Sequence, residues 1–460
     1  MSRPATRRSA APKRSTPPEP ASLVDSLRYF LTPQLWKQVL AALGPRKASR
    51  WHAQPLLFVL LVMTWCAGDS VPERFETARA FYVASYPKRR RPGITCEGFQ
   101  KALAAVPVAA LRLVSAAVRS RLAQAFGETL VVAGFIPFGC DGSRLECPRS
   151  QELEERLPSG SSDGGPPQAW ATALVHLSTG LLWAWRLGRG DADERQHLRR
   201  LVATLPRRAL LVADAAYPGY ELLQAVAAAG LSFLIRLSSK APLYVADKST
   251  LKRYREGRVY YWPQWAQEQQ LPPIPVRLIR LRRRDADVCL ITNVLEEERL
   301  PRPTARQLYR WRWRNEGLFR TYKRTLGKVK LLSRTVAQVH RELEGSLLAV
   351  QLLLAQGAVA LHRAGAADVR PSPRQILVEI RAEIRNVVGR YLGPRQRRTY
   401  WQRLQAARRD NRRRGEDKVR RPWPARKPHK PPRPPKILKM GTDLKALMEQ
   451  TLANAEPPKC

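Results

Sequence analysis

The sequence predicts an α/β protein in which a mixed sheet follows an all-helical region and precedes a basic, partly disordered C-terminal region. Three observations lead to this fold class. Apolar residues recur at helical spacing through residues 21–127, strand-like and helix-like segments alternate from about residue 129, and residues 395–439 hold 18 Lys and Arg against three acids. The expected organisation along the chain is therefore 1–20, 21–127, 128–365 and 366–460.

The first two parts are expected to be a basic arm and a helical domain. Residues 1–20 consist mainly of Arg, Ser, Ala and Pro, a composition typical of disordered segments. Apolar periodicity predicts helices within 23–43 and 99–126, and the apolar run 55–66 is too short to span a bilayer. The basic start is not followed by the apolar core of a signal peptide, so we expect a cytoplasmic protein without a membrane partner.

The third part alternates in the way that builds a mixed sheet. A buried strand is expected over 129–141, ending at an Asp-Gly turn, and Ser178-Thr-Gly180 separates the two strands of a hairpin. The remaining expected elements are helices over 191–205 and 219–230, buried strands over 209–214 and 232–237, a small antiparallel insertion over 240–298, and helices over 304–326 and 343–361, the last of them nearly all apolar.

Charge narrows the choice of partner. The 460 residues include 81 Lys and Arg against 38 Asp and Glu, a formal net charge of +43. Such an excess repels itself and is typical of proteins that bind a polyanion. Because no apolar run of transmembrane length is evident, nucleic acid is favoured over an anionic membrane surface.

The most informative segment is the expected helix that contains Tyr309, Arg312, Glu316 and Lys323. At about 100° per residue the last three fall roughly 300°, 340° and 320° around the axis from Tyr309, so all four share one face. A phenol, two cations and one carboxylate suit a phosphodiester with a metal ion better than they suit a hydrophobic core. The simple alternative is a solvated face in an Arg-rich protein.

Two further carboxylates follow buried strands of the expected sheet. Asp141 ends the first strand and Asp214 ends the strand over 209–214. If these strands are neighbours, the two side chains converge at the carboxyl edge of the sheet, and Glu316 could complete a cluster. Three close carboxylates need a hard cation such as Mg²⁺. Glu342 and Glu344 are rival third carboxylates, although they lack the cationic neighbours of Glu316.

The spacing Tyr309-x₂-Arg312-x₃-Glu316-x₆-Lys323 resembles the motif of a large group of bacterial insertion-sequence transposases with a DDE triad, the family numbered four. The resemblance is complete at all four positions. Asp141 in Asp-Gly-Ser and the Ala-Asp-x-x-Tyr around position 214 resemble the first and second catalytic carboxylates of that group. The resemblance covers roughly residues 129–365 and, more loosely, the helical region before them. It does not extend to the residues beyond 395.

The resemblance implies an RNase H-like catalytic domain with a β-rich insertion, a DNA-binding helical domain before it, and a homodimer that synapses two transposon ends. It implies that Asp141, Asp214 and Glu316 hold Mg²⁺, with Mn²⁺ as a substitute. Water would then cleave double-stranded DNA at a transposon end, and the freed 3′-hydroxyl would attack target DNA. The residues expected to grip phosphate are Tyr309, Arg312, Lys323 and, as a further contact, Arg144.

Two other functions stay open at the level of the sequence. One is a catalytically silent DNA-binding protein derived from a transposase, and the other is an RNase H-fold nuclease that cuts without joining. Among single residues, Trp311 and Trp313 are expected to serve packing, and His176 is expected to be a hydrogen-bonded core histidine. The location that fits all three functions is the cytoplasm of a bacterium, in association with the nucleoid.

Overall fold

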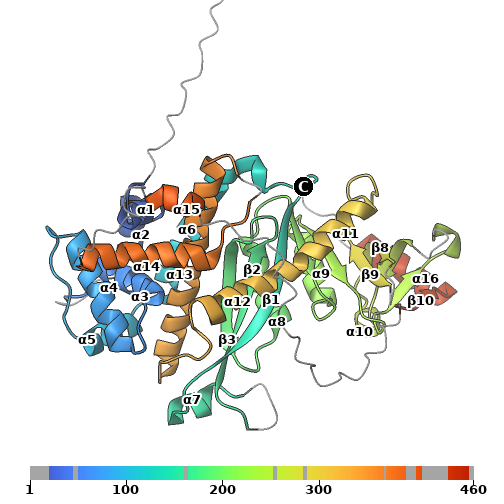
Figure 1. The fold of residues 1–460 in the computed structure, drawn as a ribbon. Coiled ribbons are helices and arrows are strands. Elements are labelled where there is room, and N and C mark those ends of the chain that lie inside the picture. The colour runs from blue at the N-terminus through green and yellow to red at the C-terminus, as the bar shows by residue number, and fades with distance from the viewer. Residues whose placement is uncertain are drawn as a thin grey trace, which may run out of the picture.

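The computed structural model describes residues 20–44, 50–159, 164–251, 256–282, 287–366, 369–389, 400–406 and 434–454. The predicted disorder of the N-terminal arm and of most of 395–439 lies outside these residues. Within them the chain is a mixed α/β protein, as the sequence predicted, in which ten strands form one sheet. Figure 1 shows the N-terminal helices gathered at one end of this sheet and the insertion at the other.

Six helices precede the sheet, and prolines divide the two longer helical stretches that the sequence predicts. Pro33 begins the second helix, where the Thr32 side chain accepts a hydrogen bond from the Leu35 amide. Pro107 occupies the N-cap of the sixth helix. The helices are α1 (Leu23–Phe30), α2 (Pro33–Leu43), α3 (Ala53–Trp65), α4 (Val71–Ser85), α5 (Cys96–Ala104) and α6 (Val108–Phe126), followed by the short 3₁₀ turn η1 (Gly127–Leu130).

Five strands in the order β3-β2-β1-β4-β5 form one half of the sheet, with β3 at its edge. β1 pairs antiparallel with β2 and parallel with β4, β2 pairs antiparallel with β3, and β4 pairs parallel with β5. This is the strand arrangement of an RNase H-like domain. The bounds are β1 (Ile136–Glu146), β2 (Gln168–His176), β3 (Leu182–Arg189), β4 (Ala209–Ala213) and β5 (Ser232–Arg236), with α7 (Gln151–Arg156), α8 (Glu194–Leu201), η2 (Val202–Thr204) and α9 (Tyr220–Ala228) between them.

The first strand differs from its prediction at both ends. A tight turn with positive φ at Ala133 and Gly134 interrupts the apolar run that begins at residue 129, so β1 starts only at Ile136. Asp141-Gly142 does not form a turn, because β1 continues through both residues paired with Ala173 and Thr172 of β2. Asp141 therefore lies in the middle of β1 rather than at its end.

The predicted insertion is antiparallel but does not form a separate sheet. β9 pairs antiparallel with β5, which makes β6 to β9 a continuation of the same sheet. The outer strand β6 pairs in parallel with β10 from the C-terminal region, a contact that the sequence did not predict. The bounds are β6 (Leu243–Val245), η3 (Lys248–Thr250), β7 (Gly257–Tyr261), α10 (Gln264–Glu268), β8 (Ile274–Leu281), β9 (Val288–Thr292), β10 (Ile437–Lys439) and α16 (Thr442–Asn454).

The predicted helix over 304–326 is present as one uninterrupted helical segment, but its hydrogen-bonding pattern changes between α, 3₁₀ and π along its length. It consists of α11 (Arg302–Trp311), the 3₁₀ turn η4 (Arg312–Arg314), α12 (Asn315–Arg320) and the π-helical turn η5 (Thr321–Thr325). Figure 1 shows α11 and α12 lying across the sheet in front of β1. Because 3₁₀ and π turns change the angle per residue, side chains before and after them leave the common face calculated for an ideal α-helix.

The long apolar helix α13 (Val336–Arg363) is a core helix, as predicted. It is long and apolar enough to cross a membrane, but 94% of its apolar window is buried inside the protein. α13 shares one hydrophobic cluster with the N-terminal helices, with α14 (Pro373–Gly389) and with α15 (Tyr400–Ala406). The N-terminal helices and the helices after α13 therefore share a core, and the domain boundaries at 127 and 365 stay predictions.

Candidate functional site

The two aspartates lie at the same edge of the sheet, as the sequence predicted, although by a different local geometry. The parallel pairing of β1 with β4 ends at Gly139 and Val212, so Asp141 stands two residues beyond it. Asp214 follows the last residue of β4 and accepts a hydrogen bond from the Ala216 amide at 2.9 Å. Parallel strands end at the same edge, which brings both carboxylates to one place.

Glu316 reaches this edge because α12 packs tightly on β1. A Cβ at Gly139 would overlap the side chain of Asn315, so only glycine allows this approach of the helix to the strand. Asn315 is 1% exposed, and its amide nitrogen and oxygen have no hydrogen-bond partner among the described residues. Glu316 is the next residue along α12 and is exposed to solvent. The contact between α12 and β1 thus sets the third carboxylate beside the first.

The electrostatics of Asp141 show that the site gathers four charged groups. Burial raises the pKa of the Asp141 carboxyl, the Gly142 amide and the Arg312 guanidinium act against this rise, and the carboxylates of Asp214 and Glu316 add to it. Each of these groups is therefore close enough to act on Asp141. The cluster holds three carboxylates and one permanent cation.

Arg312 is the cation at the centre of this cluster. Its Nη1 lies 3.8 Å from Oδ2 of Asp214, and its side chain is only 12% exposed. The guanidinium carbon lies 4.5 Å from the ring centre of Trp313 and 5.7 Å from that of Tyr309. Its buried Nε has no hydrogen-bond partner among the described residues. Arg312 is thus held between two aromatic rings with a donor to spare, which suits an anionic ligand.

The two other residues of the predicted face are placed less directly. Tyr309 is 3% exposed and packs in the cluster formed by β4, β5, β8, β9 and α11. Its contact with the site runs through Arg312. Lys323 is half-buried on η5, where Nζ donates to the carbonyl oxygen of Arg144 at 3.0 Å and where burial lowers its pKa. The four residues are therefore distributed along the segment from α11 to η5 and do not share the single narrow face that an ideal α-helix predicted.

Arg144 does not join the carboxylate cluster. Residues alternate between the faces of a strand, so positions 141 and 144 point to opposite faces of β1. The Arg144 Nε donates to the carbonyl oxygen of Gly190 at 3.2 Å, and its guanidinium lies 4.9 Å from the ring centre of Trp170. The predicted phosphate contact through Arg144 finds no support in this placement.

The sequence reasoning missed a fourth carboxylate, that of Glu194 in the first turn of α8. A Cβ at position 142 would overlap the Glu194 carboxylate, so this group lies directly against the backbone of β1. Burial raises its pKa to about 7, Asp141 and Asp214 raise it further, and Tyr217 and Arg144 lower it, so Arg144 acts on this fourth carboxylate from its own face of β1. The sequence predicts a helix over 191–205 but indicates no role for Glu194. The sequence signal that could have identified Glu194 is its position in the first turn of the helix that follows the second strand of the hairpin.

The rival carboxylates are excluded from the site by their own partners. Glu344 is 2% exposed, pairs with Arg112 and accepts a hydrogen bond from Trp185 Nε1 at 2.7 Å. Glu342 pairs with Nζ of Lys328 at 3.0 Å and accepts hydrogen bonds from the amides that follow Leu331. Both carboxylates hold α13 in the core.

Three single-residue predictions have different outcomes. His176 is a satisfied core histidine, as predicted: it is fully buried, it contacts Thr179 and the Leu130 carbonyl through its two ring nitrogens, and burial lowers its pKa to about 4. Trp311 is partly buried against the same hydrophobic cluster of β4, β5, β8, β9 and α11 that contains Tyr309, in agreement with a packing role. The prediction for Trp313 was wrong, since its side chain is 53% exposed and covers Arg312.

The donor set at this edge fits a hard divalent cation by chemistry, because it offers carboxylate oxygens without thiol or imidazole. Among the residues that the structure describes, however, no group of three or more His, Cys, Asp and Glu is close enough to hold a metal ion. In this structure the positive charge beside Asp214 comes from the Arg312 guanidinium.

Comparison with known proteins locates the same part of the chain. Residues 141–352 match the family model described as the transposase DDE domain, a range that begins at Asp141 and contains Asp214 and Glu316. Among solved structures, a cryo-EM structure of the piggyBac transposase synaptic complex with hairpin DNA is similar over 82% of this chain and 84% of that chain, with 11% sequence identity and a TM-score of 0.42. A search of curated proteins finds no match.

Proposed function

We propose that this chain is a DNA transposase that cleaves DNA at transposon ends and joins the freed ends to target DNA. One observation carries the proposal: the carboxylates of Asp214, after β4, and Glu316, on α12, both act on the buried Asp141 carboxyl of β1, and the Arg312 guanidinium lies 3.8 Å from Asp214. A fold seldom crowds three carboxylates without a ligand that compensates them. The match of residues 141–352 to the transposase DDE domain supports the same conclusion.

The three carboxylates are the groups that would hold Mg²⁺, or Mn²⁺ in its place, although in this structure they are not close enough to one another to share one ion. A divalent cation bound there would activate a water or a 3′-hydroxyl and stabilise the leaving oxygen of a phosphodiester. The chain itself prepares for this charge. Burial keeps the Asp141 carboxyl partly desolvated, which strengthens its interaction with any cation, and the exposed Glu316 carboxylate stands open to the solvent side.

Arg312 is the best-placed phosphate ligand. Its planar guanidinium offers several donors, of which the buried Nε is unused, and the rings of Tyr309 and Trp313 fix its plane. Tyr309 would therefore act by positioning Arg312. Lys323 lies further along the helical segment, on η5, and its ammonium group would contact the DNA backbone beside the cut. Arg144 lies on the other face of β1, where its Nε already donates to the Gly190 carbonyl oxygen.

The partner would be double-stranded DNA, both as transposon end and as target, in the cytoplasm of a bacterium. The helices over residues 21–127 would contribute to DNA binding, and two copies of the chain would act together because two ends must be joined. The net charge of +43 supports a polyanionic partner.

The test is cleavage of a plasmid that carries the genomic DNA flanking the gene, with Mg²⁺ present. We expect the parent protein to cut at the inverted repeats and Asp141→Asn, Asp214→Asn and Glu316→Gln to lose at least about a hundredfold in rate. Glu298→Gln changes an exposed carboxylate away from the site and serves as the matched control. If any of the three site variants cleaved like the control, the role of that residue would be refuted.

Two outcomes would favour the other functions. A parent protein that binds the flanking DNA with the same affinity as the three variants, and never cuts it, would be a silent DNA-binding protein. A parent that cuts but does not join pre-cut ends to a second plasmid would be a nuclease without strand transfer.

A further inference from the structure

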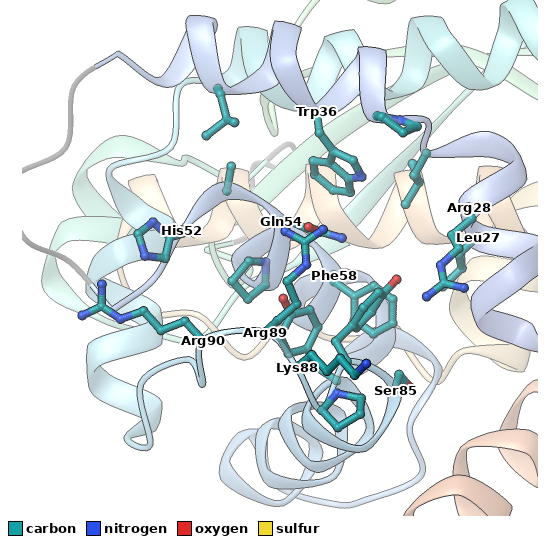
Figure 2. Close-up of a pocket in the computed structure, with 18 residues that line it drawn as sticks. Leu27, Arg28, Trp36, His52, Gln54, Phe58, Ser85, Lys88, Arg89 and Arg90 are labelled. Carbon is teal, nitrogen blue, oxygen red and sulfur yellow. The ribbon is translucent and has the colours of Figure 1, made fainter.

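The N-terminal helices enclose a cavity that the proposed catalytic site does not use. It has a volume of about 890 Å³, within the range of ligand sites, and lies between α1, α2, the start of α3, the end of α4 and the segment after α4. Its walls are mainly apolar, and no Asp or Glu is among the residues that line it. In Figure 2 Arg28 and Arg90 lie at the two sides of the cavity, whereas Arg89 extends across it towards Gln54 and Trp36.

Aromatic rings form the inner wall. Phe58 contacts Tyr82 and Tyr86 with ring centres 5.4 and 5.6 Å apart, and the two tyrosines lie 5.0 Å from each other. Trp36 projects from α2 on the opposite side towards Gln54 and Arg89 (Figure 2). Trp36 is only partly buried, so one of its surfaces is free for a planar ligand to stack on.

Cations form the rim. Lys88, Arg89 and Arg90 are exposed, and their side chains make no ion pair with the residues that the structure describes, whereas Arg28 pairs with Asp25 at 3.0 Å. Burial raises the pKa of Tyr82 and Tyr86 and Arg89 acts in the opposite direction, which places this guanidinium near both phenols. Unpaired cations at the mouth of an apolar cavity are complementary to a ligand with an anionic and a flat apolar part.

A polar side chain also lines the cavity. The Gln54 amide on the facing wall offers donors and an acceptor. The Ser85 hydroxyl oxygen is occluded by its neighbours and is therefore not within reach of a ligand.

We propose that this cavity binds an unpaired nucleotide of DNA, with the base stacked on Trp36 and the neighbouring phosphates on Lys88, Arg89 and Arg90. The inference rests on the proposed function in that DNA is the partner. A base supplies the flat ring and the hydrogen-bonding edge, and its backbone supplies the anions, which together match the rings, the Gln54 amide and the rim. A fully paired duplex hides its bases and would touch only the rim.

The test compares two fluorescein-labelled duplexes of one sequence, one fully paired and one with a single additional unpaired thymidine in one strand. Binding to the full-length protein is followed by fluorescence anisotropy in EDTA at fixed salt. We expect the parent to bind the second duplex at least about fivefold more tightly, the lower limit for stacking of one base. Trp36→Ala should abolish this preference and Trp36→Phe should retain it.

The rim is tested by Arg89→Glu with Arg90→Glu, which should weaken binding of both duplexes about tenfold or more. Lys436→Glu with Lys439→Glu changes the net charge equally at exposed positions around β10 and is the matched control. A parent without preference, a Trp36→Ala protein that keeps it, or a control pair that weakens binding as much as the rim pair would overturn the proposal.

Two further measurements keep the outcome decisive. Cross-linking of 5-iododeoxyuridine at the unpaired position should label a peptide that contains Trp36 or Tyr86 in the parent protein, and a label elsewhere would refute the site even if Trp36→Ala failed to fold. A change in sedimentation of Trp36→Ala without a change in DNA preference would mean that the cavity holds a second copy of the chain. Plasmid cleavage by the same parent preparation separates the two proposals: cleavage without preference removes only this one.

Discussion

Two groups of carboxylates, one on α13 and the other at the edge of the sheet, differ in how their charge is compensated. Glu342 and Glu344 on α13 each have their own cation and further hydrogen-bond donors. Asp141, Asp214 and Glu316 share one guanidinium, that of Arg312. The first group needs nothing more, whereas the second leaves negative charge uncompensated and a donor of Arg312 unused.

The pKa of Glu342 follows this difference, whereas that of Glu344 does not. Although burial opposes it, Lys328 and the donors around Ser333 hold the pKa of Glu342 below its ordinary value. At the sheet edge, burial raises the pKa of Asp141 and Glu194, and neighbouring carboxylates add to the rise. A buried carboxylate with a lowered pKa stabilises the fold at neutral pH, and one with a raised pKa destabilises it. Burial also raises the pKa of the structural carboxylate Glu344, against the opposing effect of Arg112 and the Trp185 donor, so the direction of a pKa shift does not by itself separate the two groups.

The largest effect that would test this comparison is on stability at α13. Glu344→Gln should lower the free energy of unfolding by about 2 kcal/mol, because it weakens the charge-assisted hydrogen bonds that Arg112 and Trp185 donate to this buried carboxylate. Glu316→Gln should change it by less than about 0.5 kcal/mol, since Glu316 is exposed. Urea titrations followed by tryptophan fluorescence measure both. Equal losses of unfolding free energy would show that Glu344 and Glu316 contribute equally to stability, which contradicts the proposed difference between them.

A smaller effect is expected from the shape of the central cation. Arg312→Lys keeps the charge but loses the planar donors and the contacts with the Tyr309 and Trp313 rings, so DNA cleavage should slow about tenfold while the protein stays folded. Arg310→Lys makes the same change at an exposed neighbour and should leave the rate unchanged. Cleavage that responded equally to both variants would argue against a specific role of Arg312.

The smallest effect concerns pH. Folding raises the pKa of Glu194 from 4.5 to about 7, so this carboxyl supports the fold when protonated and loses that contribution as the pH rises from 4.5 to 7. Glu194→Gln should therefore stabilise the protein by about 1 kcal/mol at pH 8, a value reduced from the full shift because Glu194 is partly exposed, and by nothing below pH 4.5. Urea titrations at both pH values check this, and a gain that grew as the pH fell would have the wrong sign.

Local sequence was a good guide wherever neighbouring residues decide the structure. The hairpin at Ser178-Thr-Gly180, the buried strand before Asp214 and the core helix α13 were predictable from alternation, turn residues and apolar runs. It was a poor guide at Asp141-Gly142. An Asp-Gly pair favours a turn in isolation, but β2 pairs along this stretch and the Glu194 carboxylate requires a glycine there.

The sequence by itself determined the chemistry that this protein has available: a strongly basic chain, an α/β order of elements, and the residues Asp141, Asp214, Arg312 and Glu316 at suggestive positions. Only the tertiary structure decided which of these charges meet. It brought Arg312 to Asp214, excluded Glu342 and Glu344 through their own partners, turned Arg144 to the other face of β1 and added Glu194. Residue types and periodicity are local properties, whereas burial and partnership of a charge depend on chain segments that are far apart in sequence.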